Sequence, residues 1–219
     1  MPRAERIPLL HAVTDDAVVA RAGFAERAEE VLAAGGSRLA LHLRAHAASG
    51  RALHGLAARL AARAGETGSL LLVNDRVDVA LAAGAHGVQL GRRSLSVADA
   101  RRLGGGMLLG ASVHAVEEGG EAAEAGADFL VAGAVYPTAT HPGRAGAGLR
   151  LIESVAALGL PVIAIGGVTP ERAGELRRAG AMGMAAIRGV WDAPSPADAV
   201  QRYIDAWQSW RRRPRFRSA

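Results

Sequence analysis

The sequence predicts a (β/α)8 barrel, and three observations support this fold class. Eight short apolar runs of strand length alternate along the 219 residues with Ala-, Arg- and Glu-rich stretches of helical length. The short runs are continuously apolar, which is typical of strands covered on both faces, as in parallel sheets. Strand–helix repetition predicts right-handed βαβ units. Length and strand count fit a closed barrel of about 250 residues; an open doubly wound sheet, usually with fewer strands, is the alternative.

The individual elements follow from these patterns. The predicted strands are Leu9–Val13, Leu39–Leu43, Leu70–Val73, Gly87–Leu90, Met107–Ala111, Phe129–Ala132, Val162–Ile165 and Met184–Ile187. Apolar residues at three- and four-residue spacing predict helices within Ala20–Ala34, Ala52–Ala64, Ala115–Ala125, Pro170–Ala179 and Ala197–Trp210. No Pro/Gly linker divides the chain, so we expect one barrel domain over residues 1–219, with a basic tail at about 211–219.

Composition excludes several classes of function. All 26 basic residues are arginine and there is no cysteine, which excludes lysine Schiff bases, disulfide scaffolds and thiolate metal sites. Five arginines of the tail account for the whole net charge of +5, so the neutral body does not predict nucleic-acid binding. No apolar run reaches the roughly 20 residues of a membrane span, and the apolar stretch near the start is too short for a signal peptide. We expect a cytoplasmic protein and leave open a homo-oligomer.

In this fold the active site lies in the loops at the carboxyl ends of the strands, so polar residues after each apolar run are the candidates. His42, His46, His114 and His141 lie there. Histidine is suited to proton transfer near neutral pH, although each one alone is more often structural. A His-rich zinc site is the competing interpretation. It lacks paired spacing and nearby carboxylates, so no metal site is predicted.

The segment Ile163–Pro170 predicts a phosphate site. An apolar strand enters Gly166 and Gly167, and Pro170 begins a helix with Thr169 as its cap. Glycine lets backbone N–H groups approach an anion, and barrels commonly bind phosphate in the loops after strands seven and eight. Gly167 would share the phosphate with the backbone of Ile187 and Arg188. The alternative is a tight turn that needs glycine for steric reasons alone.

Taken in order, the strand-end motifs resemble the thiamine phosphate synthase superfamily, and most closely its TenI-like thiazole tautomerases. The resemblance spans roughly residues 8–205. The matching segments are His11–Asp16, His42–Arg44, Asn74–Leu81, Val88–Leu90, Ser112–His114 and Pro161–Pro170, while Tyr136–Thr140 looks more like the synthase branch.

A synthase of this family joins a pyrimidine diphosphate to a thiazole phosphate and releases pyrophosphate. The resemblance implies that its substrate-binding residues are kept here as Arg44, Asn74, Asp75, Ser112, Thr138 and Thr140. It also implies four replacements: His42 for a glutamine, His46 and His141 for lysines, and Ser94 for the second magnesium-binding aspartate. One carboxylate flanked by arginine makes a poor magnesium site. Mg²⁺ is therefore expected only if the synthase activity holds.

A tautomerase of this family moves a proton on a carboxylated thiazole phosphate and requires no metal. It needs a phosphate cradle, a cation such as Arg44 for the carboxylate, and an acid/base. The family's catalytic histidine aligns with Ala134, so His141, His42 and His114 are the candidate substitutes. We predict a cofactor-free thiazole tautomerase acting on a small phosphorylated thiazole. The alternatives are the synthase and a non-catalytic binder of thiazole or thiamine phosphates.

Overall fold

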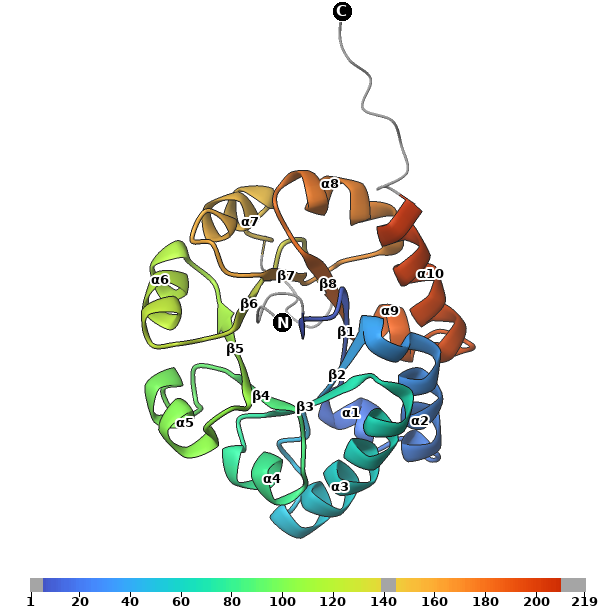
Figure 1. Cartoon of the computed structure of the whole chain (residues 1–219). Coiled ribbons are helices and arrows are strands. Elements are labelled where there is room, and N and C mark those ends of the chain that lie inside the picture. Colours follow the sequence, from blue (N-terminus) through green and yellow to red (C-terminus); the bar gives the residue numbers. More distant parts are fainter. Residues whose placement is uncertain (1–5, 139–144, 210–219) are drawn as a thin grey trace, which may run out of the picture.

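A computed structural model describes residues 6–138 and 145–209. Eight parallel strands pair in chain order, and β8 closes on β1, with the helices forming an outer ring (Figure 1). The closed barrel confirms the predicted fold class over an open sheet. The strands are β1 (Leu10–Val13), β2 (Leu39–Leu43), β3 (Leu70–Asn74), β4 (Gly87–Leu90), β5 (Leu108–Val113), β6 (Phe129–Gly133), β7 (Val162–Ile165) and β8 (Gly183–Ala186).

The five predicted helical ranges are helical in the structure, with small shifts at their ends. The predicted helix at Ala20 instead begins at Phe24, because Gly23 before it takes a left-handed backbone with φ 70°. The helices are α1 (Asp16–Val19), α2 (Phe24–Gly35), α3 (Gly50–Thr67), α4 (Val77–Ala82), α5 (Val97–Gly104), α6 (Val116–Glu124), α7 (Leu149–Ala156), α8 (Ala173–Arg178), α9 (Arg188–Trp191) and α10 (Pro196–Ser209), with the 3₁₀ turns η2 (Gly36–Arg38) and η3 (Pro170–Arg172).

The strands are apolar on both faces because one face packs on the helices and the other fills the barrel. The barrel interior holds a separate apolar cluster that includes Leu72, Leu108, Phe129 and Ile163. Phe129 fits there because β5 carries Gly110 opposite it. A Cβ at that position would lie 2.3 Å from the phenylalanine ring. Side chains of a strand alternate between the two faces, so the strand pattern also decides which residues point inward.

A buried ion pair fastens the loops at the amino-terminal end of β5 and β6. Arg101 of α5 donates from Nη2 to Asp128 Oδ2 at 2.7 Å and also donates to three loop carbonyls. The same Asp128 oxygen accepts the Leu109 N–H at 2.9 Å. Asp128 is almost fully buried, so this contact is a structural element of the barrel rather than a surface ion pair.

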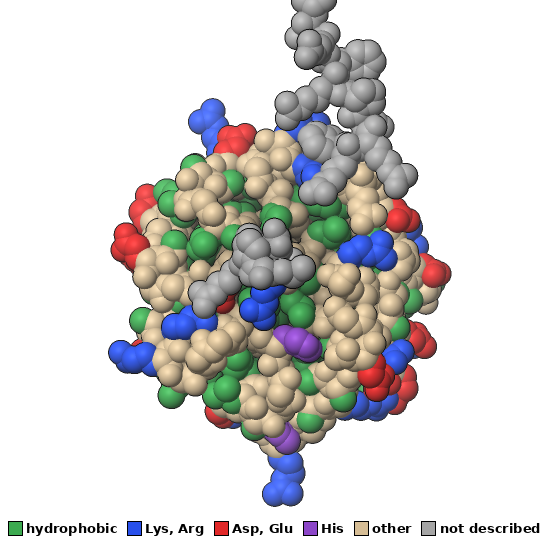
Figure 2. All heavy atoms as spheres, in the orientation of Figure 1, with side chains coloured by type: hydrophobic (Ala, Val, Ile, Leu, Met, Phe, Trp, Pro, Cys, Tyr) green, Lys and Arg blue, Asp and Glu red, His purple; other side chains and the backbone are tan. Residues whose placement is uncertain are grey.

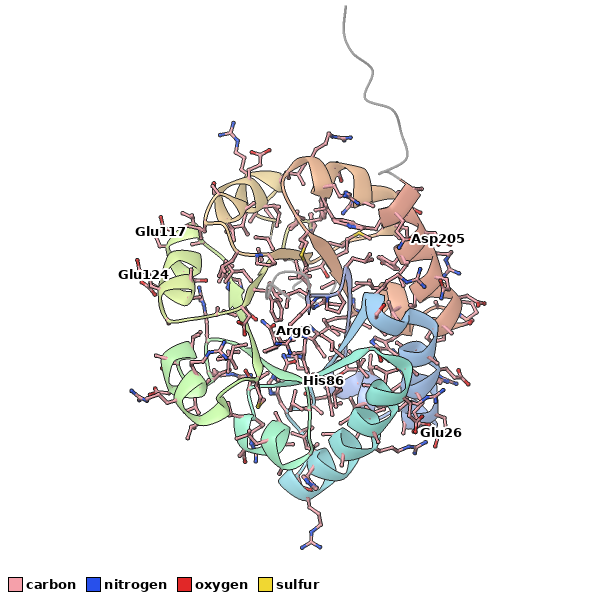
Figure 3. All side chains as sticks on the ribbon, in the orientation of Figure 1. Arg6, Glu26, His86, Glu117, Glu124 and Asp205 are labelled. Carbon is pink, nitrogen blue, oxygen red and sulfur yellow. The ribbon has the colours of Figure 1, made fainter. Side chains whose placement is uncertain are left out.

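The views look onto the amino-terminal ends of the strands. Arg6, which precedes β1, lies near the barrel axis, and His86, which precedes β4, lies at the strand ends close to β3 (Figure 3). On this face, charged side chains of both signs are spread around the rim (Figure 2). The carboxyl-terminal ends, where the candidate site lies, are on the opposite face. Within residues 6–138 and 145–209, no helix combines the length and apolarity needed to cross a membrane.

Candidate functional site

Three loops bring polar side chains together at the carboxyl-terminal mouth of the barrel. Asp75, directly after β3, takes a left-handed backbone with φ 64°. Its Oδ1 accepts the Gly91 N–H at 3.2 Å and the hydroxyl of Ser94, both from the loop after β4. Its Oδ2 lies 3.6 Å from Nδ1 of His46, from the loop after β2. Sequence reasoning named Asp75 as a site residue but did not predict that His46 and Ser94 would meet it.

Below this cluster, the inward-facing residues of β3, β4 and β5 form a polar layer. Asn74 and Gln89 are paired positions on neighbouring strands, and Gln89 Nε2 donates to Ser112 Oγ at 2.9 Å. The side-chain oxygens of Asn74 and Gln89 are buried and have no hydrogen-bond partner among the described residues. Unpaired buried acceptors are costly, so this layer is incompletely satisfied. Sequence reasoning did not select Gln89, although it is the one polar residue of Gly87–Leu90.

His42 lies inside the barrel rather than at its open mouth. It is 1% exposed, and its Nε2 lies 2.7 Å from Nδ1 of His11. His11 Nε2 lies 3.0 Å from the carbonyl of Pro8, which can only accept. His11 Nε2 therefore carries the proton, and His42 Nε2–H donates to His11 Nδ1. Burial lowers the pKa of His11 to about 4 and holds the pKa of His42 well below its ordinary value. Both rings are neutral at pH 7.

The other predicted catalytic histidines have different surroundings. The side chain of His114 is half exposed, and its Nδ1 lies 3.3 Å from Oε2 of Glu118 on α6. That oxygen also accepts the His114 backbone N–H at 2.6 Å. Thr138 is described, whereas Thr140 and His141 lie outside the described residues. Catalytic roles for His42, His114 and His141 stay predictions.

The loop after β7 makes the turn that the glycines predict. Gly166 and Gly167 have φ of 97° and 63°, and a Cβ on Gly167 would lie 2.7 Å from the carbonyl of Pro137. Steric need alone therefore accounts for these glycines. β7 and β8 are neighbours, which places the loop after β8 beside them. Outside the regular elements, the described residues offer no backbone acceptor to the N–H groups of Gly167 or Arg188. Thr169 occupies the predicted cap position, but its side chain makes no capping bond.

A magnesium site of the kind that the resemblance implies does not fit these residues. Asp75 is the single carboxylate of the cluster, and Ser94, which stands where a second aspartate is implied, donates its hydroxyl to Asp75 instead. Among the described residues, no group of three or more histidine, cysteine, aspartate or glutamate side chains is arranged to hold a metal ion.

Comparison with known proteins agrees with this architecture. A family model described as "Thiamine monophosphate synthase" matches residues 10–190. A thiamine-phosphate synthase of Chlorobium luteolum is 43% identical over 170 residues, which cover 76% of this chain and 80% of the relative. That of Thioalkalivibrio sulfidiphilus is 39% identical over 201 residues, or 90% of this chain and 94% of the relative.

A solved structure gives the same result for the fold. The thiamine phosphate pyrophosphorylase of Pyrococcus furiosus superposes with a TM-score of 0.82 at 32% identity, covering 95% of this chain and 98% of that chain. The family model alone covers well over half of the chain. The chain therefore belongs to the thiamine monophosphate synthase family and is an enzyme of thiamine biosynthesis.

Proposed function

We propose that this enzyme is a thiamine-phosphate synthase, which joins a pyrimidine diphosphate to a thiazole phosphate. The observation that carries the choice is the state of His42, one of the three histidines predicted as the acid/base of a tautomerase. It is buried, neutral and hydrogen-bonded to His11, so it is poorly placed to carry a proton to and from a substrate. The synthase reaction needs no such proton carrier. The relatives named above support the proposal, because their names give this activity. This reverses the order of preference that the sequence alone suggested.

The reaction explains which groups the site must supply. The lone pair of the thiazole nitrogen forms a bond to the methylene carbon of the pyrimidine. The bond from that carbon to the diphosphate oxygen breaks, and its electron pair leaves with pyrophosphate. No proton is transferred in this step. The protein must align the two halves and stabilise the negative charge that develops on the leaving group.

Arg44 is the residue we assign to that charge. It follows β2 on the same side of the strand as Ala40 and His42, at the mouth of the barrel. Thr14 holds its backbone, because the Thr14 hydroxyl accepts the Arg44 N–H at 2.8 Å and donates to the Arg44 carbonyl at 3.0 Å. Arg44 makes no ion pair within the described part of the chain, so its guanidinium is free to bind an anion, bidentately where geometry allows.

We assign the binding of one substrate to the polar layer and of the other to the glycine loop. Asn74 of β3 and Ser112 of β5 belong to the polar layer on the inner face and would contact the pyrimidine half. Gly166 and Gly167, with the backbone of Ile187 and Arg188, would hold the phosphate of the thiazole half. On this assignment the reacting carbon and nitrogen would meet between the β3–β5 side and the β7–β8 side of the mouth.

The test is product formation by the purified chain. Incubation with the pyrimidine diphosphate and thiazole phosphate, with and without added Mg²⁺, should yield thiamine phosphate, detected as fluorescent thiochrome after oxidation. Arg44→Gln should lower kcat/KM by about a hundredfold, because a charge-assisted contact to the leaving group is lost. Arg51→Gln, an exposed arginine of α3, serves as the matched control. Absence of product at every Mg²⁺ concentration would refute the proposal.

One observation favours the tautomerase as a second candidate. The Asp75 carboxylate lies 3.6 Å from His46, an imidazole that is one-third exposed at the mouth. A carboxylate-oriented histidine is a suitable acid/base for metal-free proton transfer. If this candidate is correct, the carboxylated thiazole phosphate should aromatise faster than in buffer, followed by ultraviolet absorbance, and His46→Gln should abolish the acceleration. An unchanged rate in that variant would show that His46 and Asp75 take no part in the proton transfer.

A further inference from the structure

Tyr203 of α10 touches both loops that form the proposed phosphate site. It is 2% exposed, and its hydroxyl donates to the carbonyl of Val168, just after the glycine turn, at 2.9 Å. The same hydroxyl lies only 2.0 Å from the position that a Cβ on Gly189 would occupy. The Tyr203 hydroxyl is therefore hydrogen-bonded to the loop after β7 and packs against the backbone after β8. In Figure 1, α10 lies outside β8 and β1, next to α9.

The two loops are otherwise anchored in different directions. Arg172 donates to the Gly167 carbonyl at 2.6 Å and so fastens the loop after β7 to its own 3₁₀ turn. Trp191 of α9 donates from Nε1 to the Val13 carbonyl at 2.8 Å, which fastens the segment after β8 toward β1. Neither contact relates one loop to the other. The Tyr203 hydroxyl does, because it meets both backbones.

We propose that Tyr203 is a positioning residue of the phosphate site, whose hydroxyl sets the spacing between the loops after β7 and β8. This inference rests on the proposed phosphate site but not on the choice between synthase and tautomerase, since both substrates are thiazole phosphates. Backbone N–H groups on two separate loops can bind one phosphate only if their separation matches its oxygens. Tyr203 itself is buried behind the loops and is not assigned any contact with the ligand.

Gly189 makes the inference testable in a second, independent way. Its φ is not in the left-handed region, so alanine is compatible with its backbone. The obstacle to a Cβ is the Tyr203 hydroxyl at 2.0 Å, and the next nearest atom is the ring Cζ at 3.1 Å. Gly189→Ala should therefore push the loop and the hydroxyl apart. Removing the hydroxyl should make room for the added methyl group.

The experiment is a double-mutant cycle read by calorimetry. The probes are 4-methyl-5-(2-hydroxyethyl)thiazole phosphate and the same alcohol without phosphate, and the readout is the ratio of their affinities. Tyr203→Phe should lower the preference for the phosphate ester about fivefold, the loss of one neutral hydrogen bond. Gly189→Ala should lower the same preference by at least about tenfold relative to the wild type. The double variant should show the preference of Tyr203→Phe alone.

A matched control separates positioning from general stability. Ser69→Ala also removes a buried hydroxyl, bonded to Thr67 at 2.7 Å, but at the amino-terminal end of β3. This control should leave the affinity ratio unchanged even if it lowers the thermal unfolding midpoint as much as Tyr203→Phe does. The proposal is overturned if all four proteins of the cycle show the same affinity ratio, or if the losses add in the double variant. It is also overturned if the wild type does not prefer the phosphate ester. Because binding is measured without turnover, failure to form thiamine phosphate refutes only the proposed function.

Discussion

Acid should destabilise this barrel through the two histidines inside it. His11 and His42 are buried and hydrogen-bonded to each other, and burial lowers the pKa of both. The native rings stay neutral over a range where the same residues in the unfolded chain bind protons. The unfolded state therefore gains protons as the pH falls, and the free energy of unfolding decreases. For His11, this stability is fully present above its ordinary pKa of 6.5 and is lost as the pH falls toward about 4.

The size of the effect follows from the His11 pKa. Shifting a pKa from 6.5 to about 4 makes the free energy of unfolding at pH 5 about 2 kcal/mol lower than at pH 7. His42 contributes with the same sign. His11→Gln should remove the His11 contribution, because the glutamine amide can still donate to the Pro8 carbonyl and accept from His42. The variant should then show a shallower dependence of stability on pH than the wild type.

Urea unfolding at pH 7, 6 and 5 measures this directly, with the fluorescence of the buried Trp191 and Trp207 as the signal. His54→Gln is the control, since His54 is exposed on α3 and should leave the wild-type slope unchanged. The reasoning fails if His11→Gln and the wild type lose the same unfolding free energy between pH 7 and pH 5. It also fails if the control variant flattens the slope equally.

Three further predictions concern named contacts. Asp128→Ala should lower the free energy of unfolding in urea by about 3 to 5 kcal/mol, because it leaves Arg101 without its buried partner; a loss below about 1 kcal/mol would contradict this. Ser94→Asp places a second carboxylate beside Asp75 and should tighten Mn²⁺ binding, measured by electron paramagnetic resonance with inorganic pyrophosphate, by about tenfold over both the wild type and Ser94→Ala. Gly167→Ala, at a φ of 63°, should abolish calorimetric binding of the thiazole phosphate while the circular dichroism spectrum is kept, and wild-type affinity would show that the turn does not shape the site.

The sequence alone determined the barrel with little error. Strands such as Leu39–Leu43 and Val162–Ile165 agree with the prediction at both ends, because a buried parallel strand must be apolar on both faces and the pattern is local. The helix ends shifted by a few residues where glycine geometry, as at Gly23, decided the boundary. The carboxyl ends of the strands also located the mouth, so Arg44, Asn74 and Asp75 were placed there without coordinates. Their substrate-binding roles come from the family resemblance and stay predictions.

The tertiary structure alone decided which of those residues meet. His42 and His11 are 31 residues apart, and their hydrogen bond depends on the register between β1 and β2, which no local pattern contains. The meeting of Ser94 with Asp75 likewise requires two loops to converge. Tyr203 reaches the loops after β7 and β8 only because α10 packs against the closed barrel. Periodicity along a chain reflects burial, which is local, whereas chemistry depends on distances that closure and register set.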